Sequence, residues 1–197
     1  MRLEPRVLSG RIVRLEPFAP TLEAEVRRAL DVDPQAWAIM SSPADGPRFD
    51  GWWAQAMTEA AAARRIPLAV RRLDTGEVVG TTSFLEIRAP HRSVEIGATF
   101  YRSDQRSGPV NPECKQLMLA QAFEAGAVRV EFAVDTRNLR SQAAVLKLGA
   151  TKEGVLRKHK TTWTGFVRDT AVFSITDDEW PGVRAGLDAR LAAFGAS

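Results

Sequence analysis

The chain has 197 residues, of which 45% are hydrophobic and 26% are charged, a mixture typical of a folded globular domain rather than a disordered chain. Its length suits one domain. No apolar run reaches the roughly 18 residues of a membrane span, and the N-terminus lacks the apolar stretch of a secretory signal. The net charge of +3 is too small to indicate a nucleic-acid partner.

The cysteine content bears on disulfides, metal sites and the cellular compartment. Cys114 is the only cysteine, so the chain can form neither an internal disulfide nor a cysteine-based zinc cluster. We therefore expect no metal site and a reducing, cytoplasmic compartment. The densest basic cluster, at 157–160, is read as a solvated strand edge or turn.

Hydrophobic alternation and turn residues predict a mixed α/β order along the chain. The first half should contain a strand at 11–15, two helices at 20–30 and 49–63 joined by a proline-rich loop, and strands at 67–72 and 78–85. The second half should contain strands at 93–101, 128–134, 153–160 and 166–175 and helices at 112–125, 138–148 and 178–193. We expect one central mixed sheet of about seven strands, flanked by helices.

The unit from 93 to 134 carries the most information about function. A strand, a helix and a second strand of these lengths form a βαβ crossover, which makes the two strands parallel. Asn111 is the expected N-cap of the helix and Pro112 its first residue. The loop at 102–111 therefore lies beside a helix N-terminus, which suits an anion such as phosphate. It matches neither a Walker loop nor a dinucleotide fingerprint.

Several ordered motifs resemble one family. Gln105 and Gly108 match the pyrophosphate arm of the GNAT N-acetyltransferases, and Asn138 and Ser141 lie in a segment that resembles the family's later motif, which ends at Lys147-Leu-Gly149. Glu153-Gly154 and, after a turn, Arg168-Asp169 are typical of the RimJ/RimL-like branch. The resemblance covers residues 8–181, a single GNAT-type domain, and leaves 182–197 as a C-terminal helix and tail.

The resemblance implies that acetyl-CoA is the cosubstrate, with pantetheine along the strand at 97–101. Pro109 and Pro112 remove two amide donors from the arm. We expect the side chain of Arg106, with Arg102 or Lys115, to replace part of that binding. The residues expected to bind acetyl-CoA are Phe100, Tyr101, Gln105, Arg106, Ser107, Gly108, Val110, Asn111, Asn138, Ser141 and Lys147.

In this family the amine attacks the thioester directly, so the enzyme needs a base for the amine proton and an acid for the departing thiolate. Val145 occupies the position where many members have a tyrosine acid, which makes Ser141 the candidate acid. Lys160 replaces the carboxylate that serves as base in RimL-type enzymes. Glu95 and His159 are the remaining candidates for the base, each acting directly or through water.

A doubtful base favours an acceptor that deprotonates easily, so an α-amine, such as a protein N-terminus, is the expected acceptor. One alternative is a small amine, namely a polyamine, an amino acid or an aminoglycoside. Its support is a set of acidic residues before residue 66: Asp31, Asp33, Asp45, Asp50 and Glu59.

Another alternative is a non-catalytic module that only binds acetyl-CoA. Met40, Trp37, Trp52 and Trp53 lie either in the core or along the acceptor side. A homodimer is compatible with the sequence but not required by it.

Overall fold

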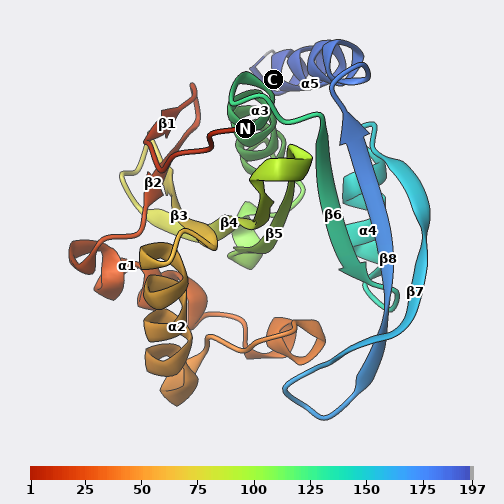
Figure 1. The fold of residues 1–197 in the computed structure, drawn as a ribbon. Coiled ribbons are helices and arrows are strands. Elements are labelled where there is room, and N and C mark those ends of the chain that lie inside the picture. Colours follow the sequence, from red (N-terminus) through yellow and green to blue (C-terminus); the bar gives the residue numbers. More distant parts are fainter. Residues whose placement is uncertain (196–197) are drawn as a thin grey trace.

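One sheet of eight strands organises the computed structural model, which describes residues 1–195 (Figure 1). Its order is β1-β2-β3-β4-β5-β6-β8-β7, and every neighbouring pair is antiparallel except β5–β6. The predicted mixed α/β architecture is confirmed, with one strand more than expected. The strands are β1 (Leu8–Ser9), β2 (Val13–Pro17), β3 (Arg65–Arg72), β4 (Val78–Arg88), β5 (Ser93–Tyr101), β6 (Arg129–Asp135), β7 (Thr151–Thr161) and β8 (Val167–Thr176).

Helices cover the sheet on both faces and form two separate cores. One core contains Leu30, Phe49 and Trp53 and lies under α1 and α2. The larger core contains Met118, Val145 and Leu187 and lies under α3, α4 and α5. No helix among residues 1–195 is long and apolar enough to cross a bilayer. The helices are α1 (Glu23–Leu30), α2 (Phe49–Ala61), α3 (Val110–Glu124), α4 (Leu139–Leu146) and α5 (Trp180–Gly195).

The start of the chain differs from the prediction. The expected strand at 11–15 begins only at Val13, because residues 10–12 form a bend between β1 and β2. The buried carboxylate of Glu113 accepts the backbone N–H groups of Arg11, Ile12 and Val13 at 2.9, 2.8 and 2.7 Å. A β-carbon at Gly10 would lie 2.4 Å from that carboxylate, so only glycine fits there. Glu113 thereby fastens α3 to the β1–β2 turn.

Helix α3 is largely buried, as predicted, but it begins earlier than expected. Its first residue is Val110 and its N-cap is Pro109, which is already helical at φ −77° and ψ −13°. Asn111 is therefore inside the helix, and its prediction as the N-cap is wrong. Pro112 still lies in the first turn, where a missing N–H costs no intrahelical hydrogen bond. The final helix, predicted at 178–193, is confirmed as α5, while residues 196–197 of the predicted tail lie outside the described residues.

Candidate functional site

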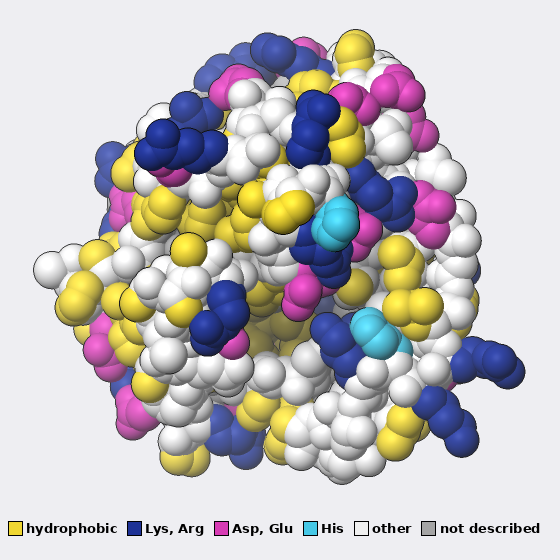
Figure 2. Space-filling view, viewed as in Figure 1, with side chains coloured by type: hydrophobic (Ala, Val, Ile, Leu, Met, Phe, Trp, Pro, Cys, Tyr) yellow, Lys and Arg dark blue, Asp and Glu magenta, His cyan; other side chains and the backbone are white. Residues whose placement is uncertain are grey.

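The parallel strands β5 and β6 pair over only three residues. Their register runs from Ser93 opposite Arg129 to Glu95 opposite Glu131 and then stops. Beyond Glu95, β5 is paired only with β4, while β6 is paired with β8 (Figure 1). The second half of β5 therefore presents a free edge of backbone groups to an opening in the sheet. The corresponding face in Figure 2 is hollowed near its centre, with hydrophobic side chains in the hollow and charged side chains around it.

A β-bulge interrupts β5 at the start of this free edge. Thr81 lies opposite Phe100 and Ser83 opposite Gly97, so Thr82 faces two residues of β5. Ala98, one of the two, has a φ of 46°, in the left-handed region. Because a bulge leaves an extra residue out of the ladder, amides here are free to bind a ligand.

The bulge also corrects the predicted alternation of β5. The sequence places Phe100 on the same face as Val94 and Ile96. In the structure Val94 and Ile96 pack in the larger core, whereas Phe100 packs in the smaller core on the opposite face. Tyr101 joins the larger core instead. One inserted residue thus exchanges the two faces of the strand.

The arm that follows β5 ends at an open helix N-terminus. It contains a 3-10 turn at Ser103–Gln105, a left-handed Ser107 with φ 66°, and Gly108, where an added β-carbon would meet no atom within 4 Å. The N-cap Pro109 makes no side-chain hydrogen bond to α3. The first amides of α3 and its positive dipole end are therefore available to an anion.

The basic side chains near the arm are already engaged. Arg102 pairs with Asp104 at 2.7 Å and with Glu77 at 3.2 Å. Arg106 donates from Nε to the Tyr101 carbonyl at 2.9 Å and pairs with Asp33 at 2.7 Å. Either arginine must exchange these partners before it can bind phosphate. The prediction that Arg106 contributes stays a prediction.

Gln105, the residue that matches the family's arm, is also fixed in place. Its side-chain oxygen accepts a hydrogen bond from Arg72 at 3.1 Å. Arg72 is the last residue of β3. The sequence gives no sign of this contact, because residues 72 and 105 are far apart along the chain and meet only in the folded protein.

Lys115 does not lie where the sequence predicts. Its side chain is buried, and Nζ donates to the hydroxyls of Thr99 at 2.8 Å and Thr82 at 3.2 Å. Burial lowers the pKa of Lys115 to about 8. The prediction that Lys115 could reach the phosphate arm is wrong, because α3 turns this position towards β4 and β5.

The neighbouring Cys114 is also buried, and its burial raises the pKa of the thiol to about 12. A protonated, inaccessible thiol is a poor nucleophile. The chemistry of this opening therefore does not pass through a covalent cysteine intermediate.

Glu95 belongs to the last residue pair before β5 and β6 separate, opposite Glu131. Its side chain is half-buried, and desolvation raises the pKa of its carboxyl, an effect that the charges of Lys160 and Arg168 oppose and those of Glu86 and Glu131 reinforce. Its Oε1 would lie 2.8 Å from a β-carbon at residue 97, next to the bulge. Among residues 1–195, its carboxylate has no hydrogen bond or ion pair, so it is free to accept a proton.

His159 is the second predicted base. His159 is exposed on β7, and partial desolvation, together with the charges of Lys160 and Arg168, lowers its pKa. Lys160 is the residue of this hairpin whose charge acts on Glu95. Of the two predicted bases, Glu95 has the less exposed side chain, and the base role of either one stays a prediction.

Ser141 lies in the first turn of α4, directly after the carboxyl end of β6. The Asn138 side chain caps this helix by accepting the Ser141 N–H at 3.0 Å. The Ser141 hydroxyl makes no hydrogen bond within the described chain. Val145 is buried in the larger core, and Lys147 is exposed beyond the last turn of α4. Because β5 and β6 are parallel, α4 and the arm lie at the same edge of the sheet and flank the opening.

Arg168, which the sequence analysis quotes only as part of a motif, is a buried charge that acts on Glu95. It is 5% exposed on β8 and donates to Thr170 at 3.0 Å and to Ser41 at 2.9 Å. Its charge reaches both Glu95 and the buried Asp135. A guanidinium within a strand of mostly apolar and β-branched residues is a signal that could have identified it.

Comparisons with known proteins agree with this geometry. Residues 13–151 match the family model described as acetyltransferase (GNAT) domain. The uncharacterized N-acetyltransferase YoaA of Bacillus subtilis (strain 168) is 35% identical over 113 residues, which are 57% of this chain and 63% of that protein.

Solved structures share the fold. A protein from T. thermophilus assigned as an acetyltransferase has 38% identity, a TM-score of 0.84, and coverage of 97% of this chain and 100% of its own. RimJ of Mycobacterium smegmatis, in complex with CoA-disulfide, has a TM-score of 0.79 over 94% of this chain and 95% of its own. At 23% identity, the RimJ comparison speaks for the fold alone.

Proposed function

Because the chain belongs to the acetyltransferase (GNAT) family, we propose that it transfers the acetyl group of acetyl-CoA to an α-amine in a ternary complex, in the manner of the RimJ/RimL-like branch. The observation that carries the proposal is the opening between β5 and β6, where a free strand edge meets the half-buried, unpaired carboxyl of Glu95.

The chain's own groups fit acetyl-CoA. The free edge of β5 offers amides and carbonyls to an amide-containing arm such as pantetheine. The backbone N–H groups of Ser107, Gly108, Val110 and Asn111 lie around the N-terminus of α3, where a pyrophosphate is favoured by the helix dipole, whereas the Arg106 N–H already donates to the Ser103 carbonyl at 3.3 Å. Asn138 and Ser141, at the start of α4, and Lys147, at its end, are the further residues that we propose for cofactor binding. Acetyl-CoA supplies the activated acyl group.

The proposed reaction forms one bond and breaks one. The amine nitrogen attacks the thioester carbon, its proton passes to Glu95 directly or through water, and the carbon–sulfur bond breaks. The departing thiolate takes a proton from Ser141, which regains one from solvent, and Glu95 releases the amine's proton to solvent. An amide at the β5 bulge stabilises the negative oxygen that develops during attack. Arg168 and Lys160 favour the charged form of Glu95 and so keep its pKa from rising further.

The α-amine is favoured over a cationic small amine by the state of the acidic residues before residue 66. Each of the five has a partner within the chain, with which a polyamine or an aminoglycoside would have to compete. Asp33 pairs with Arg106 at 2.7 Å, Asp45 with Arg48 at 2.9 Å, Glu59 with Arg65 at 3.4 Å and Asp50 with Arg27, while Asp31 accepts the Gly46 N–H at 2.8 Å.

Amine basicity points the same way. At neutral pH roughly a tenth of an α-amine is unprotonated, against less than a thousandth of a lysine side chain. An α-amine therefore depends less on the base, the role that we propose for the half-buried carboxyl of Glu95.

A substrate panel tests the proposal. Purified protein with acetyl-CoA would be offered a short peptide with a free N-terminus, an N-acetylated peptide with one internal lysine, and spermidine. We expect acetylation of the free N-terminus at a rate at least about tenfold above either of the others, in line with the difference in unprotonated amine. Faster acetylation of the lysine peptide or of spermidine would contradict it.

A further inference from the structure

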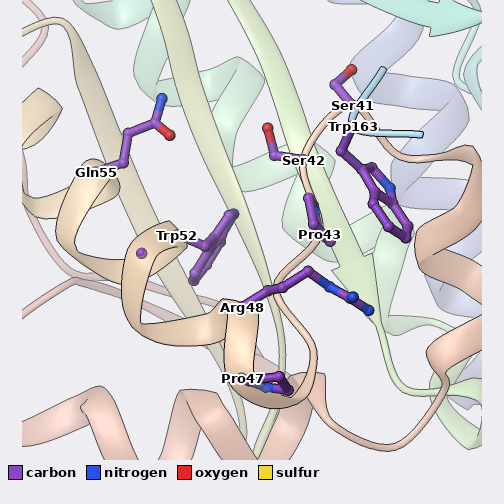
Figure 3. A pocket seen from close by; sticks show the side chains of 9 residues that line it. Ser41, Ser42, Pro43, Pro47, Arg48, Trp52, Gln55 and Trp163 are labelled. Atoms are coloured by element: carbon purple, nitrogen blue, oxygen red, sulfur yellow. The ribbon is translucent and has the colours of Figure 1, made fainter. Parts of the chain in front are cut away.

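A pocket of about 340 Å³ lies between α2, the loop that precedes it and the β7–β8 hairpin. Figure 3 shows Trp52 and Trp163 on opposite sides of this pocket, with Pro43 between them and Arg48 below. The remaining lining comes from small or neutral side chains. The lining residues are Ser41, Ser42, Pro43, Pro47, Arg48, Gly51, Trp52, Gln55 and Trp163.

Both indoles are fixed before any ligand arrives. The Arg65 guanidinium lies 5.6 Å from the centre of the Trp52 ring, and Phe49 and Phe18 pack against the same ring at 5.8 and 5.9 Å. Trp163 is 41% exposed, yet its Nε1 donates to the Trp37 carbonyl at 2.9 Å. Rigid aromatic walls bind with little loss of conformational entropy.

Two chains of contact connect this pocket with the candidate reaction site. Trp37, which holds Trp163, stacks on Phe100 of β5 with ring centres 4.5 Å apart. Ser41, a lining residue, accepts a hydrogen bond from Arg168, whose charge acts on Glu95. Trp37 thus links the pocket to β5, and Arg168 links it to Glu95.

The chemistry of the lining selects a flat, uncharged group. No carboxylate lines the pocket, and Arg48, which lies 4.7 Å over the Trp163 ring, is already neutralised by Asp45. A second cation would be placed beside Arg48 without a counter-charge. An aromatic ring, in contrast, stacks on indole faces and buries apolar area.

Resting on the proposed function, we propose that the pocket between Trp52 and Trp163 binds an aromatic ring carried by the acceptor amine. The ring belongs either to an aromatic side chain next to the α-amine or to a heterocyclic base. The pocket therefore determines acceptor specificity, while the β5 edge and the α3 N-terminus bind the acetyl donor.

The experiment compares kcat/KM for phenylalaninamide, cyclohexylalaninamide, alaninamide and lysinamide in the wild type and in Trp163→Leu. Cyclohexylalaninamide has similar volume but no aromatic face. We expect phenylalaninamide to be preferred and Trp163→Leu to lower its kcat/KM about tenfold, mainly through KM, with alaninamide changed less than twofold. Trp52→Leu should repeat the effect. Phe166→Leu, an exposed aromatic of the same hairpin outside the pocket, should not.

Adenosine added as an inhibitor distinguishes the two sources of the ring. The ring is assigned to a heterocyclic base if adenosine competes with alaninamide in the wild type but not in Trp163→Leu, and if phenylalaninamide is not preferred. If neither phenylalaninamide nor adenosine depends on Trp163, the proposal is overturned. Absence of acetylation for every amine in the panel, with acetyl-CoA binding intact in a calorimetric titration, would instead refute the proposed function.

Discussion

Replacing Lys115 with methionine should make the protein more stable at neutral pH. The ammonium of Lys115 is buried between two threonine hydroxyls with no carboxylate partner, and burial lowers its pKa from 10.5 to about 8. At about 1.36 kcal/mol per unit, this shift corresponds to roughly 3 kcal/mol of destabilisation at pH 7. Two lost hydrogen bonds offset about 1–2 kcal/mol of the gain. Thr82 and Thr99 keep each other as partners at 2.8 Å.

The destabilisation by Lys115 should decrease as the pH rises. Below pH 8 both the folded and the unfolded chain carry the proton, so the full penalty is present. Between pH 8 and 10.5 the folded chain loses the proton first, and the wild type gains stability as the pH rises.

Urea unfolding at pH 7 and pH 9.5 should therefore show an advantage of about 1–2 kcal/mol for Lys115→Met at the lower pH and almost none at the higher. Lys152→Met, at an exposed position, is the control and should change little at either pH. A variant less stable than the wild type at pH 7, or an equal difference at both pH values, would refute the reasoning.

Four further substitutions test the site and the fold. Glu95→Gln should lower kcat/KM about 10²–10⁴-fold and make the decline in rate towards low pH less steep, because protonation of residue 95 no longer adds to protonation of the acceptor amine. A pH–rate profile measures this slope, and an unchanged slope counts against Glu95 as the base. Ser141→Ala should slow turnover without lowering the free energy of unfolding, because only the backbone N–H of Ser141 takes part in the helix cap. Asn138→Ala, which removes the cap, should cost about 1 kcal/mol in urea unfolding. The reverse pattern would make Ser141 a structural residue. Glu113→Ala should cost about 3 kcal/mol or more in urea unfolding by leaving three amides unpaired, and a loss below about 1 kcal/mol would contradict the role of Glu113 in fastening α3.

Regular elements were predictable because each has a local signal. The alternation at 93–101 predicts both ends of β5 correctly. Gly149 has a positive φ of 97°, as expected for a glycine that follows a helix. The start of α3 was misplaced, because Pro109 itself takes up the helical conformation.

The site was predictable only where the resemblance supplied it. Three features of the site depend on contacts between residues distant in sequence. They are the bulge at Ala98, the burial of the Lys115 side chain and the hydrogen bond from Arg168 to Ser41. No period or spacing in the chain encodes such contacts. Trp37 illustrates the limit: composition predicts burial, which is confirmed, but not that its carbonyl holds Trp163, more than a hundred residues away.

Calorimetric titration with acetyl-CoA, comparing the wild type with Gly108→Glu, tests the central claim most directly. The new side chain has open space at Gly108, so it adds negative charge to the phosphate arm without a steric clash. Gly182→Glu is the matched control, since it also has open space and lies at the start of α5, where Trp180 stacks on Phe123 at the other end of α3. We predict binding by the wild type and by Gly182→Glu, with binding lost or weakened at least about tenfold in Gly108→Glu. Equal binding by all three, or none by the wild type, would contradict the assignment of this opening to acetyl-CoA.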